Sequence, residues 1–409
     1  MPAGLRCHPH LAGWLAIERF PIGRSATQAE LEADPHPLLA RLRVTEPVSW
    51  LAALGGWMVT RYDLAVRVMR DPSSFTVDDP RFSTSRVVGP SMLSLDGAAH
   101  TRHREPFAHP FRPTRVRDRF AGFVEAETDR LISEFQSDGG ADLRRQFAGP
   151  LAVGVVTEAL GLRDVNADRV LSWYAAIVAA VSEVTAGRPV TAAGADAFDE
   201  LRDALLRTIS RTDESSLLSE TARTPEALGQ EEVVSNAAVL MFGGIDTTEG
   251  MIVNAVRHVL GNPEGLELIR SSSADLLQSA IEESTRLEPA AAVVDRYATC
   301  DVELGGAQIR KGDLVTVSIA GANRDPAVFT EPDRFNIRRE NARLNLAFAQ
   351  GPHFCLGANL ARTETAIAIR RLRRLVDRLP GLRLDPDHPN APRGLVFRKP
   401  MALRVRWMT

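Results

Sequence analysis

The sequence has little cysteine and no long apolar run. Its 409 residues include 3 cysteines, too few and too widely spaced for a disulfide framework, which favours a reducing, intracellular setting. The most apolar early stretch, residues 11–17, is far shorter than the roughly 20 residues that a membrane span needs. It also lacks the charged flank and cleavage site of a signal peptide. We therefore expect a cytoplasmic protein that does not contact a membrane.

The sequence also lacks an excess of charge of either sign. Its 49 basic and 52 acidic residues give a formal net charge of -3, which provides no general reason to expect nucleic-acid binding. Hydrophobic residues make up 44% of the chain and charged residues 25%. This balance is typical of a globular protein and excludes a largely disordered or collagen-like chain.

The apolar spacing predicts one large domain of the α+β class, mainly α with small β-sheets at one side. We expect residues 1–34 to form an irregular N-terminal lead-in because of their prolines, and residues 35–409 to form the single domain. A helix over 231–260 is apolar on most faces, so it must cross the middle of the protein. The other predicted elements are strands over 48–50, 57–60, 302–304, around 309 and over 314–319, helices over 118–135 and 358–378, a long loop over 71–92, a meandering coil over 324–343 and a hairpin over 394–407.

The most informative segment is Phe348–Gly357, between the coil and the last long helix. Its glycines, Gly351 and Gly357, would let the backbone approach something bulky and flat. Cys355 would then open a helix whose amides and dipole stabilise a thiolate. A thiolate is a soft, anionic ligand for iron, and as the axial ligand of haem it favours O–O cleavage.

Three other interpretations of Cys355 are possible. A single free cysteine is usually a small buried hydrophobic residue. A cysteine protease would need a histidine brought from elsewhere in the fold rather than one two residues away. A zinc site would need cysteine or histidine ligands beyond Cys355 and His353, and the segment has none.

The predicted central helix contains Gly243 and Gly244, which cost about 1 kcal/mol each relative to alanine. An uncompensated Asp246 in an apolar helix costs more. One interpretation is a helix kink that packs against a neighbour. The functional interpretation is a locally opened helix that makes room for dioxygen over a haem face, with Asp246 and Thr247 as a proton relay.

Two further pairs of residues have the spacing of one helix face. Glu283 and Arg286 are three residues apart and can pair, although such pairs are common on protein surfaces. His100 and Arg104 are four residues apart at the start of a helix. Two carboxylates in an apolar pocket need charged partners, and arginine suits them through its fork of donors. The alternative is a solvated basic helix face, to which we assign Arg102.

Together these motifs resemble the cytochrome P-450 superfamily, of the soluble bacterial kind, over residues 35–409. The chain meets the family signature Phe-x-x-Gly-x-His-x-Cys-x-Gly. It departs from the usual pattern at Ala349, where glycine is usual, and at Asn345, where many relatives have histidine. The resemblance implies one triangular-prism-like domain whose long central helix crosses the haem. The signature positions are Phe348, Gly351, His353, Cys355 and Gly357.

The resemblance also implies roles for individual residues. Cys355 is the implied proximal iron ligand of haem b (iron protoporphyrin IX), and Asp246 with Thr247 is the implied acid–alcohol pair. Glu283 and Arg286 would lock the haem-binding core to the coil, with Arg334 completing the pairing. The implied cofactor-binding residues are His100, Arg104, Arg296 and His353 for the propionates, together with Phe348, Cys355 and Gly357. The implied substrate contacts are Phe82, Val87, Val88, Val239, Leu240, Gly243, Ala291, Ala292, Val293, Val396 and Phe397.

The activity that the resemblance implies is hydroxylation of a medium-to-large, mostly hydrophobic small molecule with dioxygen, in secondary metabolism or catabolism. The sequence has no dinucleotide fingerprint and no cysteine cluster. Electrons from NAD(P)H would therefore arrive through a separate ferredoxin and its reductase, which would dock on a basic patch of Arg112, Arg115 and Arg362. The alternatives are C–C or C–O coupling, desaturation or peroxide-driven oxidation by the same haem, and a haem sensor or carrier without turnover.

Overall fold

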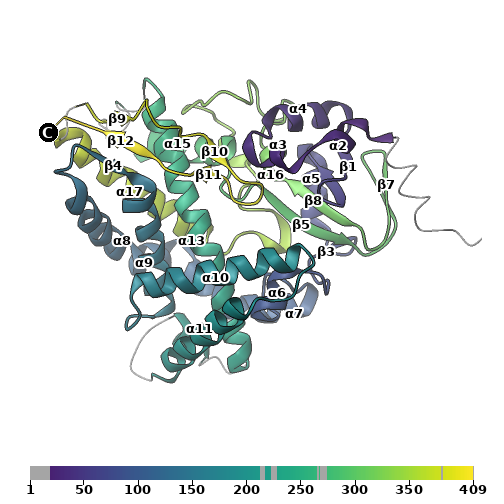
Figure 1. The fold of residues 1–409 in the computed structure, drawn as a ribbon, viewed down its shortest axis with the longest axis horizontal. Coiled ribbons are helices and arrows are strands. Elements are labelled where there is room, and N and C mark those ends of the chain that lie inside the picture. The colour runs from purple at the N-terminus through teal and green to yellow at the C-terminus, as the bar shows by residue number, and fades with distance from the viewer. Residues whose placement is uncertain are drawn as a thin grey trace, which may run out of the picture.

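The computed structural model describes residues 19–211, 217–222, 228–264, 267, 274–378 and 381–408. Helices dominate these residues, and their strands form four small sheets. The ribbon in Figure 1 has a roughly triangular outline, with the largest sheet at one side and long helices over the rest. The predicted α+β class, mainly helical with small sheets, is confirmed.

Helix α13 (Gln230–Gly261) runs through the middle of the molecule (Figure 1). It has buried residues from Val233 to Val259, which explains why its sequence is apolar on most faces. The predicted helix over 231–260 is therefore confirmed. None of the described helices is both long and apolar enough to span a lipid bilayer. Three helices that pack against α13 are α9 (Gly149–Leu160), α15 (Ala274–Leu287) and α17 (Ala358–Arg378).

Other helices surround this centre, and α8 packs along α17. The predicted helix over 118–135 lies within α8, and the one over 358–378 is α17. The helices of the described residues outside the centre are α2 (Pro21–Ser25), α3 (Gln28–Ala33), α4 (His36–Thr45), α5 (Tyr62–Arg70), α6 (Ser83–Val88), α7 (Gly97–Ala108), α8 (Pro113–Phe135), α10 (Ala167–Thr185), α11 (Ala192–Ser210), α12 (Leu217–Ala222) and α16 (Ile319–Ala322).

The largest sheet has the strand order β1-β2-β8-β5-β3. Strands β1 (Val48–Leu51) and β2 (Gly56–Val59) form an antiparallel hairpin. Its turn contains Gly55, whose φ of 60° is a conformation that glycine adopts without strain. β2 pairs in parallel with β8 (Leu314–Ser318), and β8 pairs with β5 (Val293–Ala298). The predicted strands over 48–50, 57–60 and 314–319 are confirmed.

The other strands form small sheets at the edges of the helical part. Strands predicted over 302–304 and around 309 form one of them. The small sheets pair β6 (Val302–Leu304) with β7 (Ala307–Ile309) and β10 (Pro392–Arg393) with β11 (Lys399–Pro400), and they place β12 (Arg404–Arg406) between β4 (Gly140–Asp142) and β9 (Arg383–Leu384).

Part of the predicted irregular lead-in is helical. Residues 1–18 lie outside the described residues, but α2 and α3 follow soon after. Pro21 stands in the first turn of α2, where its missing amide costs nothing. Thr27 and Glu30 form a capping box at the start of α3, which satisfies backbone donors there. The prediction of irregular structure is therefore wrong over 21–25 and 28–33.

The predicted long loop over 71–92 contains strand β3 (Phe75–Thr76) and the six-residue helix α6. Val87 and Val88 of α6 are buried, and the helix packs against α10, α11 and α13. Short helices depend on tertiary packing rather than on their own propensity. The loop prediction is therefore wrong at 75–76 and 83–88, because local periodicity carries no signal for such a helix.

The predicted hairpin over 394–407 is also wrong as a single unit. Strand β11 pairs with β10, but β12 leaves it and pairs with β4 and β9. Val405 stands opposite Ala141 and Leu384. The last strand is thus held by partners distant in sequence, and β11 is left beside the central helix α13.

Candidate active site

Cys355 follows the short helix η4 (Gly351–His353) and precedes α17. Its amide donates a hydrogen bond to the carbonyl oxygen of Phe348, 2.8 Å away, which closes the segment into a loop. The Cys355 side chain borders a cavity with about 1540 Å³ of space not filled by protein, part of it open to solvent. We name this the cysteine cavity. The helix that Cys355 was expected to open begins at Ala358 instead.

The surroundings of the Cys355 sulfur act on its pKa in opposite directions. Burial has the largest effect and raises the pKa of the thiol overall. The backbone amides of Gly357 and Ala358 and the positive charges of Arg104 and Arg362 act to lower the pKa. Amide donors and cations of this kind stabilise the thiolate form, so the loop is built for an anionic sulfur once a positive partner is bound.

The two glycines of the loop serve different purposes. Gly351 has a φ of 73°, and a Cβ there would stand 2.7 Å from the carbonyl oxygen of Met69. Gly351 thus lets the loop pack on α5, and the predicted approach to a flat group is wrong for this residue. A Cβ on Gly357 would meet only the Cys355 sulfur within 4 Å among the described residues, at 4.0 Å. The space beside Gly357 is therefore open, as the predicted approach of the backbone to a flat group requires.

Ala349 has a φ of 57°, in the left-handed region that costs a residue with a side chain roughly 1–2 kcal/mol. This explains why glycine suits the position. We expect Ala349→Gly to raise the thermal midpoint of the haem-loaded protein by a few degrees. Ala347→Gly is the matched control, since Ala347 is outside that region, and it should lower the midpoint. A similar loss in both variants would contradict this explanation.

The adjacent glycines of α13 face different neighbours. Gly243 borders the cysteine cavity, and a Cβ there would meet nothing within 4 Å among the described residues. A Cβ on Gly244 would stand only 2.6 Å from Val156 of α9. The prediction of open space therefore holds for Gly243, and the interpretation of close helix packing holds for Gly244. The helix is continuous through 243–248, so the expected local opening is not observed.

Thr247 and Asp246 lie on different faces of α13. Thr247 borders the cysteine cavity, and its hydroxyl donates a hydrogen bond to the carbonyl oxygen of Gly243. The Asp246 carboxylate is 2.6 Å from Nζ of Lys399 on β11 and borders a separate cavity. Lys399 was not predicted as a site residue, because only the fold brings β11 to this turn of the helix.

Three of the four residues predicted to hold the propionates lie near Asp96, which the sequence did not single out: His100, Arg296 and His353. The imidazole rings of His100 and His353 are 4.4 Å apart, and Nε2 of His353 is 2.8 Å from Oδ1 of Asp96. Arg296 is buried on β5, and the negative charge of Asp96 opposes the lowering of its pKa by burial. Arg104 and His353 border the cysteine cavity.

These residues fit haem on an observation independent of the resemblance. Nε2 of His100 is buried and has no hydrogen-bond partner among the described residues, which is costly unless an acceptor is supplied. Burial, His353 and Arg104 lower the pKa of His100 to about 4, so the ring is neutral and its N–H can donate. A propionate would supply the acceptor, and Cys355 would supply the thiolate that haem iron takes as an axial ligand.

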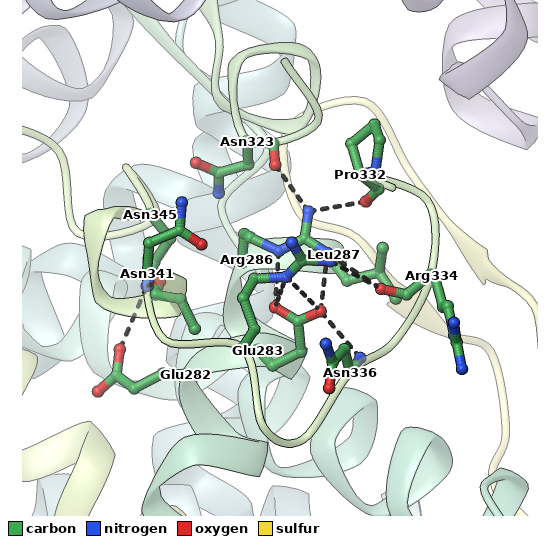
Figure 2. A network of polar contacts seen from close by, with 12 residues as sticks. Glu282, Glu283, Arg286, Leu287, Asn323, Pro332, Arg334, Asn336, Asn341 and Asn345 are labelled. Atoms are coloured by element: carbon green, nitrogen blue, oxygen red, sulfur yellow. Dashed lines mark hydrogen bonds and ion pairs between the residues drawn. The ribbon is translucent and has the colours of Figure 1, made fainter. Parts of the chain in front are cut away.

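Glu283 and Arg286 form a fully buried pair on α15, with Nε of Arg286 2.7 Å from the Glu283 carboxylate. The second guanidinium on this carboxylate belongs to Arg339, 2.9 Å away. The prediction that Arg334 completes the pairing is wrong. Its exposed side chain points away from Glu283, and only its carbonyl oxygen accepts a hydrogen bond from Arg286 (Figure 2). Glu331 has a φ of 47°. The coil that follows it turns the carbonyl of residue 334 toward Arg286.

The predicted substrate contacts divide into two groups. Val239, Leu240, Gly243 and Ala291 border the cysteine cavity. The others do not border it: Val87, Val88 and Ala292 are buried in the core, and Phe397 packs on Phe242 and borders the separate cavity. The predicted contacts that do not border the cysteine cavity are Phe82, Val87, Val88, Ala292, Val293, Val396 and Phe397, and their contact with a substrate stays a prediction. Apolar wall residues that the sequence did not mark are Met92, Leu93, Val156, Ala159, Leu160, Leu217, Met251, Ala290 and Val294.

Comparison with known proteins agrees with this geometry. The family model described as Cytochrome P450 matches residues 196–375. The cytochrome P450 monooxygenase PikC of Streptomyces venezuelae is 34% identical over 403 residues, covering 92% of this chain and 92% of PikC.

Solved structures give the same result for the fold. P450BioI, in complex with an acyl carrier protein ligated to hexadec-9Z-enoic acid, has a TM-score of 0.81 and 27% identity over 92% of this chain and 99% of that chain. CxnD, a cytochrome P450 enzyme for C–S bond formation in chuangxinmycin biosynthesis, has a TM-score of 0.80 and 30% identity over 92% of this chain and 96% of that chain. Since relatives match it over nearly its whole length and its cysteine faces a cavity fitted for haem, the chain belongs to the cytochrome P450 family and is a haem-thiolate monooxygenase.

Proposed function

We propose that this monooxygenase hydroxylates a medium-to-large, mostly hydrophobic small molecule in bacterial secondary metabolism or catabolism. The observation that carries the proposal is that Cys355 and Thr247 border one cavity whose other walls are mainly apolar. Apolar pockets with a few polar groups bind hydrophobic small molecules and orient them. The likeness to CxnD, an enzyme of chuangxinmycin biosynthesis, supports a role in secondary metabolism.

The residues of the chain would divide the work as follows. When bound, haem with a thiolate ligand supplies the activation of dioxygen for insertion of one oxygen atom into a C–H bond. Cys355 would hold the iron, and its anionic form is supported by neighbouring amides and by Arg104. The apolar walls, including Val239 and Leu240, would exclude water and orient the substrate. Thr247 would hold a proton at the edge of the cavity, and Asp246 would supply it.

His100, Arg104, Arg296 and His353 would hold the propionates of the haem. Asp96 would orient this group, since it accepts a hydrogen bond from His353 and is close to Arg296. The single carboxylate of Asp96 does not neutralise the two guanidinium groups of Arg104 and Arg296, and the neutral His100 ring adds a hydrogen-bond donor. The cluster therefore retains positive character for two carboxylates.

A second candidate is oxidative bond formation in the same cavity, namely C–S, C–C or C–O coupling, or desaturation. The observation that favours it is the 30% identity with CxnD, which is named for C–S bond formation. Peroxide-driven oxidation is less favoured, since Asp246 and Thr247 have the chemistry of a proton relay that serves dioxygen. A haem sensor or carrier would have no use for that relay.

A ligand-library titration that follows the Soret band of the haem, with product analysis of each hit, tests the proposed function. We expect a hydrophobic hit to be converted, in the presence of NAD(P)H, ferredoxin and reductase, into a product with one added oxygen atom. A product of coupling or desaturation without added oxygen would instead support the second candidate. Hits that bind without any NAD(P)H-dependent product would overturn both.

We further propose that electrons come from NAD(P)H through a separate ferredoxin and its reductase, in the cytoplasm. The free thiols Cys300 and Cys355 suit a reducing compartment. Arg112 and Arg115 are exposed. Their segment lies near the cysteine loop, since Nδ2 of Asn359, just after that loop, donates to the carbonyl oxygen of Phe111, 3.2 Å away. An acidic ferredoxin would meet these two charges.

Arg362 was predicted as a third residue of the dock, and we leave it out of the proposed dock because its side chain has partners within the protein. Its Nε is 2.6 Å from the Glu282 carboxylate, and its guanidinium lies over the Phe348 ring, 4.2 Å from the centroid. Arg362 is therefore engaged with Glu282 and Phe348, and its positive charge acts on the Cys355 sulfur.

Reversing the charge of both Arg112 and Arg115 to glutamate should lower the rate of reduction by an acidic ferredoxin roughly tenfold at low salt and weaken its dependence on ionic strength. Stopped-flow reduction under carbon monoxide measures both quantities. Arg207→Glu on α11 is the matched control and should change neither. An unchanged rate and salt dependence in the double variant would reject the dock.

A further inference from the structure

One end of the cysteine cavity is closed by a segment outside the central helix. Gly243 and Thr247 of α13 border the cavity. Asn236 comes two turns before Gly243 and three turns before Thr247, so it lies on the same face of the helix. The Asn236 side chain is fully buried, and its Oδ1 accepts a hydrogen bond from the Met92 amide, 2.8 Å away. The segment 91–94, which we name the serine turn, therefore lies against this end of the cavity face.

The serine turn is a compact unit that carries two side chains of the cavity wall. The amide of Ser91 donates to Oγ of Ser94, 3.1 Å away, and the amide of Ser94 donates to the carbonyl oxygen of Ser91, 3.0 Å away. Met92 and Leu93, between the two serines, border the cysteine cavity. Because the turn is closed by its own hydrogen bonds, the place of these two apolar side chains depends on how the turn is attached to α13.

The Asn236 carboxamide has one orientation that suits all three of its partners. Its oxygen faces the Met92 amide, and its nitrogen is 2.7 Å from the carbonyl oxygen of Glu232 and 3.0 Å from Nδ1 of His103. In the reverse orientation the amide nitrogen would face the Met92 amide, and two donors would meet. The carboxamide nitrogen has only hydrogens to offer, so Nδ1 of His103 must act as an acceptor.

An accepting Nδ1 determines where the neutral His103 ring carries its proton. The proton then lies on Nε2, which is 3.3 Å from Oε1 of Glu232. The Arg102 guanidinium lies 3.2 Å from Nε2 and pairs with the same carboxylate, so both groups donate to Glu232. The carboxylate thus fixes one side of the ring, and the other side is left to hold Asn236.

His103 has the protonation state that Asn236 needs. The ring is buried in α7, and burial lowers the pKa of His103 overall, while Glu232 opposes this effect and Arg102 adds to it. The charged or titratable groups that face the ring within the described part of the chain are Glu232 on α13 and, on α7 itself, Arg102 and His100. The ring is therefore neutral at neutral pH, with a free lone pair on Nδ1.

We propose that Asn236 is a positioning residue that fixes the serine turn as the end wall of the substrate cavity, and that neutral His103 holds its carboxamide in the orientation that this requires. The inference rests on the proposed function, because it takes the substrate to be a hydrophobic molecule in the cysteine cavity. A fixed end wall limits the length of the molecule that fits. Two polar residues behind the wall thus select substrates by length.

The same contacts make the end wall sensitive to pH. A second proton on the His103 ring would lie on Nδ1 and would face the amide hydrogens of Asn236, so the hydrogen bond between them would be lost. Since the pKa of His103 is lowered from its usual value, the wall is fixed at neutral pH. It is released as the pH falls below the usual titration range of histidine.

Linear alkyl isocyanides of increasing chain length measure the wall in the haem-loaded protein. Each binds ferrous haem iron through its isocyanide carbon, has no titratable group and places its chain in the cavity. In the wild type, we expect Kd from Soret titrations to fall roughly three- to fourfold per added methylene and to stop falling beyond one chain length. In Asn236→Leu, chains below this limit should bind within twofold of the wild type, and longer chains at least fivefold more tightly.

Variants of His103 separate its hydrogen bond from its bulk. His103→Asn offers a side-chain oxygen in place of Nδ1 and should keep the wild-type limit at every pH, whereas His103→Leu removes the acceptor and should behave as Asn236→Leu does. Thr208→Val removes a buried hydroxyl that bonds within α11. It is the matched control for the loss of a buried polar group and should keep the limit. An unchanged limit in both Asn236→Leu and His103→Leu would overturn the proposal.

A readout without an added substrate tests the contacts themselves. In the ferrous carbon monoxide form of protein labelled with ¹⁵N-histidine and ¹³C-methyl methionine, His103→Asn and Met92→Leu assign the two signals that matter. The wild-type His103 ring should carry its proton on Nε2, and Asn236→Leu should move both its Nδ1 signal and the Met92 methyl signal. A wild-type ring with its proton on Nδ1 at neutral pH would contradict the proposal, even if no variant folds.

The pH dependence and the chain-length limit distinguish failure of the wall from failure of the proposed function. The ratio of long-chain to short-chain affinity in the wild type should follow the titration curve of the His103 ring. If the ring titrates and the ratio stays constant, or the ratio changes while the ring does not titrate, the proposed role of His103 is wrong although the function stands. If longer chains bind the wild type no better than the shortest, the proposed hydrophobic substrate is wrong, and the His103 signal still decides whether the ring holds Asn236.

Discussion

Replacing Glu283 with glutamine is expected to destabilise the protein by roughly 3–5 kcal/mol, or to prevent stable haem binding altogether. The Glu283 carboxylate is fully buried and receives both Arg286 and Arg339. A neutral amide would leave two buried guanidinium groups without a counter-charge, which is among the costliest changes in a protein interior. The thermal midpoint and the yield of haem-loaded protein measure the loss.

The effect should reach the cysteine loop because this network ties α15 to the coil that precedes it. Arg286 donates to the carbonyl oxygens of Asn323 and Pro332, both at 2.8 Å, and the amide of Asn336 donates to Glu283 at 3.0 Å (Figure 2). These bonds fix backbone groups of the coil to side chains of α15. Loosening them would therefore free the coil that leads into the haem-binding segment.

Arg334→Gln is the control for this prediction. Arg334 is exposed and pairs with Glu331 at 3.5 Å, and exposed pairs of this kind contribute about 0–1 kcal/mol. We expect a change within about 0.5 kcal/mol. If Arg334→Gln were as damaging as Glu283→Gln, the assignment of Arg339 as the second partner would be wrong.

Thr247→Ala is expected to lower the yield of product per NAD(P)H at least about tenfold, with the lost reducing equivalents recovered as peroxide. A positioned proton donor contributes roughly 10²–10⁴-fold to such steps, and Thr247 has its hydroxyl at the edge of the cysteine cavity. A hydroxyl that donates to the Gly243 carbonyl can still accept a hydrogen bond from another donor. Parallel measurements of NAD(P)H, peroxide and product test this.

Two variants separate the hydroxyl from its surroundings. Thr247→Ser keeps a hydroxyl and should retain most of the coupling. Thr248→Ala removes the neighbouring hydroxyl, which is buried, and should leave coupling near the wild-type value. Tight coupling in Thr247→Ala would show that this hydroxyl does not handle the proton.

The parts of the site that could be predicted from the sequence are those encoded within one short segment. Cys355 and Gly357 lie in one loop, and Gly243 and Thr247 in one helix. A spacing rule or a helical face is enough to place each of these pairs. The buried pair of Glu283 and Arg286 was found by its spacing, but spacing alone could not distinguish it from an exposed pair.

The parts that were missed depend on segments distant along the chain. Arg339, Asp96 and Lys399 each reach the site from another element, and no local pattern marks them. The prediction for Arg334 was wrong because the coil turns the Arg334 carbonyl, not its side chain, toward the buried pair. The side chain that reaches Glu283 belongs to Arg339, five residues later. Helix α6 escaped prediction for a similar reason, since its packing against α10 stabilises it.

The most direct test of the account is the spectrum of the reduced, haem-loaded protein under carbon monoxide. If the Cys355 thiolate binds the iron, the Soret band must move to the long-wavelength position typical of sulfur coordination. Cys355→Ser should abolish that band, and Cys300→Ser, at the other described free cysteine, should retain it. A wild-type protein without the shifted band, or a Cys355→Ser variant that keeps it, would contradict the account.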